Sequence, residues 1–158
     1  MSNVATATRL FREGCACSQA ILAAYGKPLG LSRQTALHIS AGFEAGMYMG
    51  QVCGAVAGAL MVLGLRHAGP NSRTPAGRAE LRARVIEFRK RFKERNGSLI
   101  CRELLRTDIS TPEGMAEAKQ QKLFRTRCVN MVKDAAEILE EMEAISDPAD
   151  AAKDRRQS

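Results

Sequence analysis

Apolar residues recur along much of this chain at spacings of three and four, the period of an α-helix that buries one face. The strict alternation of apolar and polar positions that is typical of a half-buried strand is scarce. We therefore expect an all-α fold, a single-domain helical bundle of five or six helices over residues 1–146. Asp147-Pro148 is expected to end the last helix, which leaves 147–158 as a polar, frayed tail.

The most hydrophobic stretch, residues 51–65, carries no charge and is expected to form the central, fully buried helix of the bundle. It is shorter than the about 20 residues that a membrane span needs, so we do not expect an integral membrane protein. Gly54 and Gly58 are four residues apart and share one helix face, where another backbone can approach closely. Each glycine costs about 1 kcal/mol of helix stability relative to alanine, so close packing must compensate.

Start and stop signals divide the rest of the chain into further helices. Ser32 and Thr74-Pro75 are typical helix starts, Thr111-Pro112 marks another, and Asn96-Gly97 is a typical helix end. Besides the central helix, the helices expected from the apolar pattern are 5–25, 31–41, 75–95, 99–105 and 123–145.

Four of the five cysteines occupy the apolar face or the N-terminal turn of different expected helices. Cys17 lies on the buried stripe of the first helix and Cys128 on that of the last. Cys53 and Cys101 fall at helix N-termini, where free N–H groups and the helix dipole favour a thiolate. Cys15 lies about 200° from Cys17 round the first helix and is expected to lie outside this group. A buried cysteine often serves only as a small hydrophobe, and no Cys-x-x-Cys pair marks a metal site.

Composition excludes several functions and suggests a compartment. The 158 residues carry a formal net charge of +7 and only 4% aromatic residues. Without stacking aromatics or zinc-finger spacing, we expect no nucleic-acid partner despite the basic charge. No Ser/His/Asp, paired-carboxylate or nucleotide-binding motif stands out, and His38 and His67 are not expected to be ligands. The N-terminus lacks the apolar region of a signal peptide, so a cytoplasmic location is expected, where thiols stay reduced unless they are catalytic, sensing or metal-bound.

The segments around the four cysteines carry a recognisable pattern. Residues 53–58 have the form Cys-Gly-Ala-x-x-Gly. One further cysteine segment precedes this signature, at 11–20, and two follow it, at 97–105 and from residue 128. This pattern resembles the C_GCAxxG_C_C family, which is named for this signature, and the resemblance implies a redox-active protein. The resemblance covers about residues 11–140 and implies that the characteristic cysteines of the family are Cys17, Cys53, Cys101 and Cys128.

Three functions stay open at this point. The first is a thiol redox protein working by dithiol–disulfide exchange, with Cys53 and Cys101 as nucleophiles and Cys17 and Cys128 as resolving partners in one of three pairings. The second places the same four thiolates around an iron–sulfur cluster or a tetrahedral zinc ion in the bundle interior. The third is a non-enzymatic accessory or binding protein with structural cysteines. The expected partner is a redox protein or, as the resemblance implies, a transport-associated one.

Overall fold

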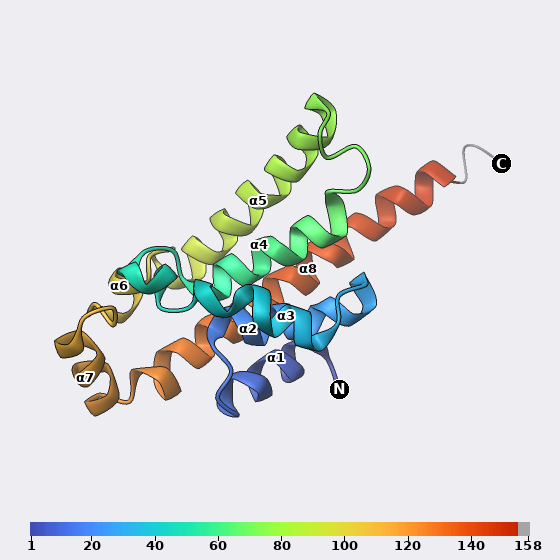
Figure 1. Ribbon diagram of the computed structural model, residues 1–158. Coiled ribbons are helices and arrows are strands. Elements are labelled where there is room, and N and C mark those ends of the chain that lie inside the picture. The colour runs from blue at the N-terminus through green and yellow to red at the C-terminus, as the bar shows by residue number, and fades with distance from the viewer. Residues whose placement is uncertain (155–158) are drawn as a thin grey trace.

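The computed structural model describes the backbone of residues 1–154 and the side chains of residues 1–145. Within this part of the chain it contains eight α-helices and no β-strand (Figure 1). The expected all-α architecture is confirmed, whereas the expected number of five or six helices is wrong. The helices are α1 (Asn3–Arg12), α2 (Cys17–Gly26), α3 (Arg33–Ser40), α4 (Gly54–His67), α5 (Pro75–Asn96), α6 (Cys101–Leu105), α7 (Pro112–Gln120) and α8 (Val129–Asp154).

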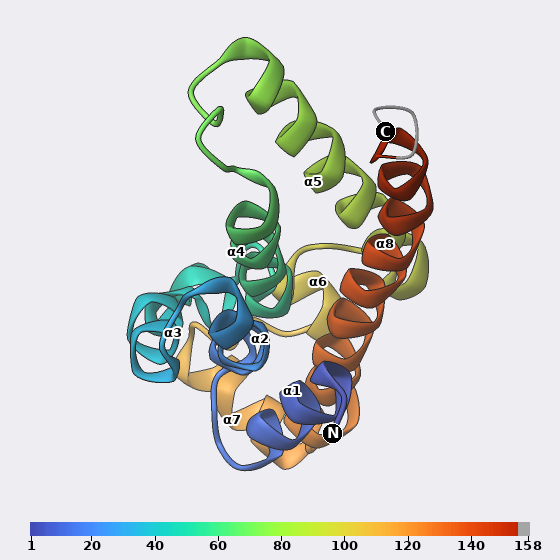
Figure 2. The same ribbon diagram turned by 90° about the vertical axis from the view of Figure 1, so that its right-hand side faces the viewer.

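The expected central helix is α4, which packs against α2, α5 and α8 (Figure 2). The expectation that this helix is fully buried is wrong, because part of its surface stays accessible and Leu65 near its C-terminal end is 40% exposed. No helix in the described part of the chain is long and apolar enough to cross a membrane. The glycine face of α4 meets α2, because a Cβ atom added at Gly58 would lie 2.8 Å from the carbonyl oxygen of Ser18. The expected close backbone approach at this face is therefore confirmed.

The first expected helix, 5–25, is wrong, because the chain folds into two helices, α1 and α2, in this region. The break lies at Gly14, whose φ of 106° belongs to a conformation that glycine adopts without steric cost. The apolar stripe continues on both sides of this position, and periodicity alone does not detect a break that preserves the pattern. As a result Cys17 is the first residue of α2 and does not lie in the middle of a long helix.

The last expected helix, 123–145, differs at its C-terminal end. A π-helical turn at Phe124–Cys128 leads directly into α8, which agrees with the expected start, whereas α8 continues past Asp147-Pro148 to Asp154, so the expected helix end is wrong. The alanine-rich residues that follow the proline have high helix propensity, which favours continuation. Within the expected tail, residues 155–158 lie outside the described residues, and the division of the chain at 146–147 stays a prediction.

The helix starts expected from capping residues are confirmed. Ser32, Thr74 and Thr111 each accept a hydrogen bond from the backbone N–H three residues further on. Gly97, with a φ of 87°, ends α5. These local signals need no tertiary contact, since the side chain and the free N–H belong to the same turn, which explains why the sequence was sufficient to place them.

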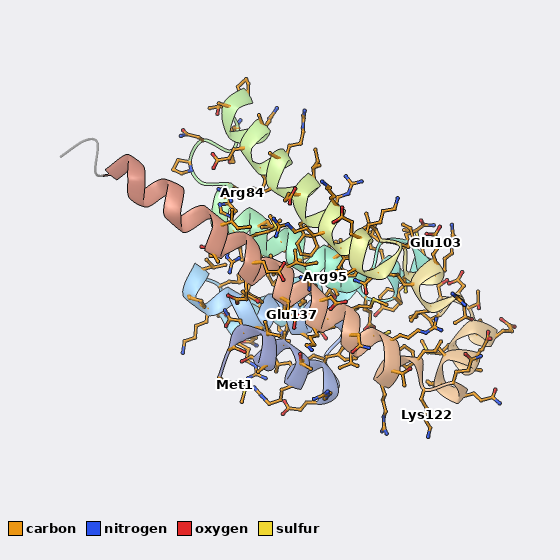
Figure 3. All side chains as sticks on the ribbon, turned by 180° about the vertical axis from the view of Figure 1, so that it is seen from behind. Met1, Arg84, Arg95, Glu103, Lys122 and Glu137 are labelled. Carbon is orange, nitrogen blue, oxygen red and sulfur yellow. The ribbon has the colours of Figure 1, made fainter. Side chains whose placement is uncertain are left out.

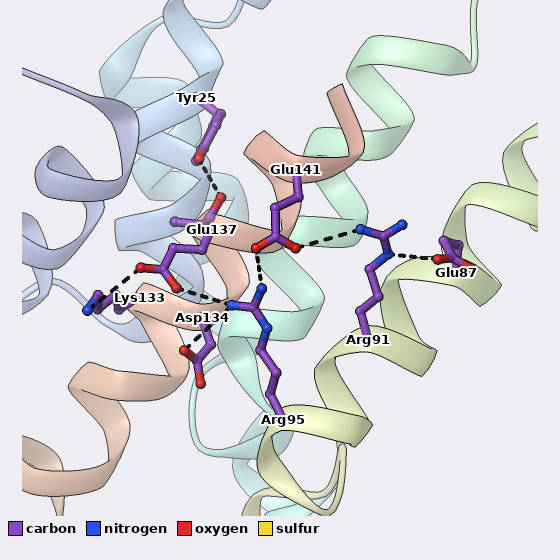
Figure 4. A network of polar contacts seen from close by, with 9 residues as sticks. Tyr25, Glu87, Arg91, Arg95, Lys133, Asp134, Glu137 and Glu141 are labelled. Carbon is purple, nitrogen blue, oxygen red and sulfur yellow. Dashed lines mark hydrogen bonds and ion pairs between the residues drawn. The ribbon is translucent and has the colours of Figure 1, made fainter. Parts of the chain in front are cut away.

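Ion pairs join α5 to α8 on the back of the molecule, where Figure 3 places Arg95 and Glu137 together. The Arg95 guanidinium lies 3.1 Å from Glu137 and 4.0 Å from Asp134, and it also contacts Glu141. Arg91 lies 3.6 Å from the same Glu141 (Figure 4). Because these side chains are partly exposed, each pair contributes about 1 kcal/mol or less. The network orients α8, which carries one wall of the site described below.

The glycine face of α4 leads to a stability prediction with an internal control. Gly58→Ala should destabilise the protein by about 1–2 kcal/mol, because the added methyl group meets backbone atoms of α2 that are unable to move independently. Gly64→Ala, in the same helix, has open space around the added Cβ atom and should stabilise by roughly 0.5–1 kcal/mol. Urea unfolding followed by circular dichroism measures both. Equal effects of the two substitutions would show that the helices do not meet at Gly58.

Candidate functional site

A cavity of about 730 Å³ lies where α1, α2, α4 and α6 meet the Phe124–Cys128 turn. All five cysteines line it, Cys17, Cys53, Cys101 and Cys128 as well as Cys15. The five are free thiols. Most of the other lining side chains are apolar. Segments that are far apart in the sequence thus direct their cysteines to one enclosed space.

Backbone pairing between two loops brings Cys53 and Cys101 together. Val52 and Ile100 form an isolated antiparallel bridge. The Cys53 N–H donates to the Leu99 carbonyl at 2.8 Å, and the Cys101 N–H donates to the Gln51 carbonyl at 2.6 Å. Since Cys53 is the cap of α4 and Cys101 the first residue of α6, two helices begin side by side at the cavity. A bridge this short has no alternating sequence pattern, and sequence reasoning missed it.

Cys17 reaches the start of α4 because position 54 is a glycine. A Cβ atom at Gly54 would collide with the Cys17 sulfur and would lie 2.9 Å from the Phe43 carbonyl oxygen. The second residue of the Cys-Gly-Ala-x-x-Gly signature therefore provides the space for the sulfur of another segment. Cys128 completes the group from the opposite wall, where it packs against the small apolar cluster that contains Cys101 and Leu105.

The thiols at helix N-termini were expected to be acidic, and this expectation is wrong in direction. Burial raises the pKa of Cys53 to about 11 and the pKa values of Cys17 and Cys101 to about 12, and it raises the pKa of Cys128 as well. For Cys53 the backbone N–H groups of Ala55 and Val56 act in the opposite direction but do not outweigh burial. Cys53 keeps the lowest pKa of the four.

The four thiols also raise one another's pKa values. The negative charge of one thiolate opposes ionisation of its neighbours, and this effect links every pair among Cys17, Cys53, Cys101 and Cys128. The same four cysteines line one cavity, so the charge effects agree with their positions. Cys15 is not among the groups that raise these four pKa values, although it lines the same cavity. It lies on the wall because the break at Gly14 turns it inward, a position that the continuous first helix did not predict.

A left-handed turn forms the part of the wall that contains Glu44 and Tyr48. Four successive residues, 45–48, have φ between 51° and 61°, and three of them are not glycine. Each non-glycine residue in this region costs about 1 kcal/mol or more, so the surrounding contacts must hold the turn in place. The Tyr48 hydroxyl donates to the Glu44 carboxylate across it. The sequence carries no signal for left-handed alanine, methionine and tyrosine, because these residues disfavour that conformation.

A metal site was one of the expectations for these cysteines. Among the side chains that the structure describes, no group of three or more histidine, cysteine, aspartate or glutamate residues is arranged to hold a metal ion. Neither His38 nor His67 lines the cavity. The thiols therefore lie around the cavity and are not close enough together to bind a single metal ion.

The fold and the site together define an α-helical protein built around a cavity of buried thiols. The family described as "Putative redox-active protein (C_GCAxxG_C_C)" matches residues 15–142. This chain belongs to that family, and the resemblance noted in the sequence is confirmed. No curated protein and no solved structure matched the chain.

The raised pKa values predict that stability falls in alkali. Below the unfolded thiol pKa of 9.0 both states keep their protons and the contribution is fully present. Above it the unfolded chain releases protons that the folded protein retains up to a pKa of about 11 or 12, so stability is lost as the pH rises through this window. Unfolding free energies of the reduced protein in urea, measured across this range, should decline less steeply for Cys53→Ala and Cys128→Ala. Slopes equal to that of the unmodified protein would contradict the burial of these thiols.

Proposed function

We propose that this protein performs thiol–disulfide redox chemistry at the cysteine-lined cavity. The observation that carries the proposal is the convergence of Cys17, Cys53, Cys101 and Cys128 on one cavity, where the charges of the other three thiols help to raise the pKa of Cys128. Membership of a family described as redox-active supports it. Free thiols at close quarters are the requirement for a dithiol that becomes a disulfide.

In the proposed reaction a protein thiolate attacks one sulfur of a substrate disulfide and displaces the other sulfur as a thiolate. A second protein thiolate then attacks the mixed disulfide, which leaves a protein disulfide and a second substrate thiol. The substrate gains two electrons and the protein loses two, while the protons of the two protein thiols pass to the substrate thiolates. Because the raised pKa values keep the thiolate fraction small near neutral pH, the rate should increase with pH.

The pKa values of the four thiols suggest their order of action. Cys53 keeps the lowest pKa of the four, so its thiolate fraction is the largest. We assign the first attack to Cys53 and the resolving step to one of the other three thiols. This order keeps Cys53 in the nucleophilic role expected from its position at a helix N-terminus.

A second proposal, ligation of an iron–sulfur cluster by the same four thiols, is favoured by the mutual coupling of all four around a cavity. Cluster binding would deprotonate the thiols despite their raised pKa values. A single-ion zinc site has less support, given that the described side chains hold no such group.

Disulfide mapping tests the first proposal. The reduced protein, oxidised with diamide and alkylated, should show disulfides only among Cys17, Cys53, Cys101 and Cys128 by peptide mass spectrometry, with Cys15 recovered as the alkylated thiol. Cys15→Ala should retain these disulfides, and Cys53→Ala should lose at least one. A disulfide that includes Cys15 would contradict the assignment.

Anaerobic purification separates the alternatives. Visible absorbance together with bound iron would favour the cluster over thiol exchange. Colourless protein that forms the mapped disulfides supports the first proposal. Colourless protein that forms neither a cluster nor the mapped disulfides would leave a transport-associated accessory role with structural cysteines.

A further inference from the structure

We propose that the cavity is a binding site for a small organic anion with an apolar body, and that the disulfide substrate is of this class. The second half of the proposal rests on the proposed function. The first half concerns binding alone and stands on the lining of the cavity.

The interior of the cavity fits an apolar body. Its volume of about 730 Å³ exceeds what sulfur atoms occupy and lies within the range of small-molecule sites, about 300–1,000 Å³. A large part of the wall comes from α6, α7 and the segments that flank them. The apolar side chains of this part are Leu104, Leu105, Ile109, Met115, Phe124 and Met131.

The charged residues of the lining favour an anion. Arg12, at the end of α1, and Arg125, in the turn before α8, both line the cavity and are exposed, so water and a dissolved anion can reach them. Neither takes part in the ion pairs found among the described side chains. Glu44 is the single acidic residue of the described lining, and its carboxylate already accepts from the Tyr48 hydroxyl. The lining therefore contains two arginines outside these ion pairs and one glutamate that already accepts a hydrogen bond.

This division of the lining orients a ligand. A carboxylate or sulfonate at Arg12 and Arg125 gains charge-assisted hydrogen bonds, while the apolar body enters the cavity. A disulfide carried on that body then lies among the cysteines that line the cavity. Thiol–disulfide exchange does not change the anionic group of the ligand, so the product thiol keeps the same contacts with the two arginines.

Matched fluorescent probes test the binding step without any redox chemistry. Anilinonaphthalene sulfonate is an aromatic anion, and N-phenylnaphthylamine is its neutral counterpart. The double variant Arg12→Gln/Arg125→Gln should weaken binding of the anion at least about threefold at low salt, because each partly exposed cation contributes modestly. Binding of the neutral probe should stay unchanged. The control Arg82→Gln/Arg89→Gln removes the same charge from exposed positions of α5 outside the cavity and should leave both probes unaffected.

A reactive pair of probes connects the site to the thiols. Dithiobis(nitrobenzoate) is an anionic aromatic disulfide and dithiodipyridine a neutral one. The cavity variant should slow the reaction of the reduced protein with the first at least about threefold, for the same electrostatic reason, and leave the reaction with the second unchanged. The proposed site would be overturned if the control variant lost anion binding or if the cavity variant kept it. It would also be overturned if the sulfonate bound to a loosened core, in which case neither double variant would change its binding.

The two proposals fail in distinguishable ways. If the sulfonate depends on Arg12 and Arg125 but oxidation yields no protein disulfide, the binding site stands and the redox proposal falls. If the mapped disulfides form but neither anionic probe depends on the two arginines, the redox proposal stands and the ligand class is wrong, which would direct attention to a protein disulfide as substrate.

Discussion

The close approach of α2 to the glycine face of α4 is the contact on which the site depends. Only a position without a side chain at Gly54 admits the Cys17 sulfur beside the start of α4, and Gly58 lets the backbones meet one turn further along. Once this contact is made, Cys17 and Cys53 face the same space. The bridge between Val52 and Ile100 then adds Cys101, and the turn before α8 adds Cys128. The same short signature, Cys-Gly-Ala-x-x-Gly, thus allows the two helices to pack closely and places Cys53 beside Cys17.

Burial in this interior decides the state of the thiols. A helix N-terminus favours a thiolate, but at Cys53 the loss of solvent outweighs that effect and the pKa rises to about 11. The site at rest therefore holds neutral thiols, protected from indiscriminate reaction with oxidants that attack thiolates. Such a site becomes reactive where a metal displaces the protons or a positive charge nearby lowers the thiol pKa, and the lining contains the cations Arg12 and Arg125.

Local signals in the sequence were enough for the central helix, the capping residues and the cysteines of the four segments. The features that escaped prediction depend on conformation or on distant pairing. Gly14 breaks a helix without disturbing the apolar stripe, which hid the inward position of Cys15. The left-handed residues 45–48 include side chains that disfavour this conformation, and the Val52–Ile100 bridge is too short for any periodic pattern. The left-handed turn and the bridge are both held by tertiary contacts, which the sequence of a single segment does not reveal.

The positions of the sulfur atoms test the central claim most directly. A sulfur anomalous difference map from crystals of the reduced protein would locate the sulfur of each cysteine, once the peaks of the 7 methionines are assigned along the traced chain. The account predicts that the peaks of Cys17, Cys53, Cys101 and Cys128 surround one cavity, with the Cys15 peak on its wall. A peak from any of the four on the far side of α4, away from the other three, would contradict it.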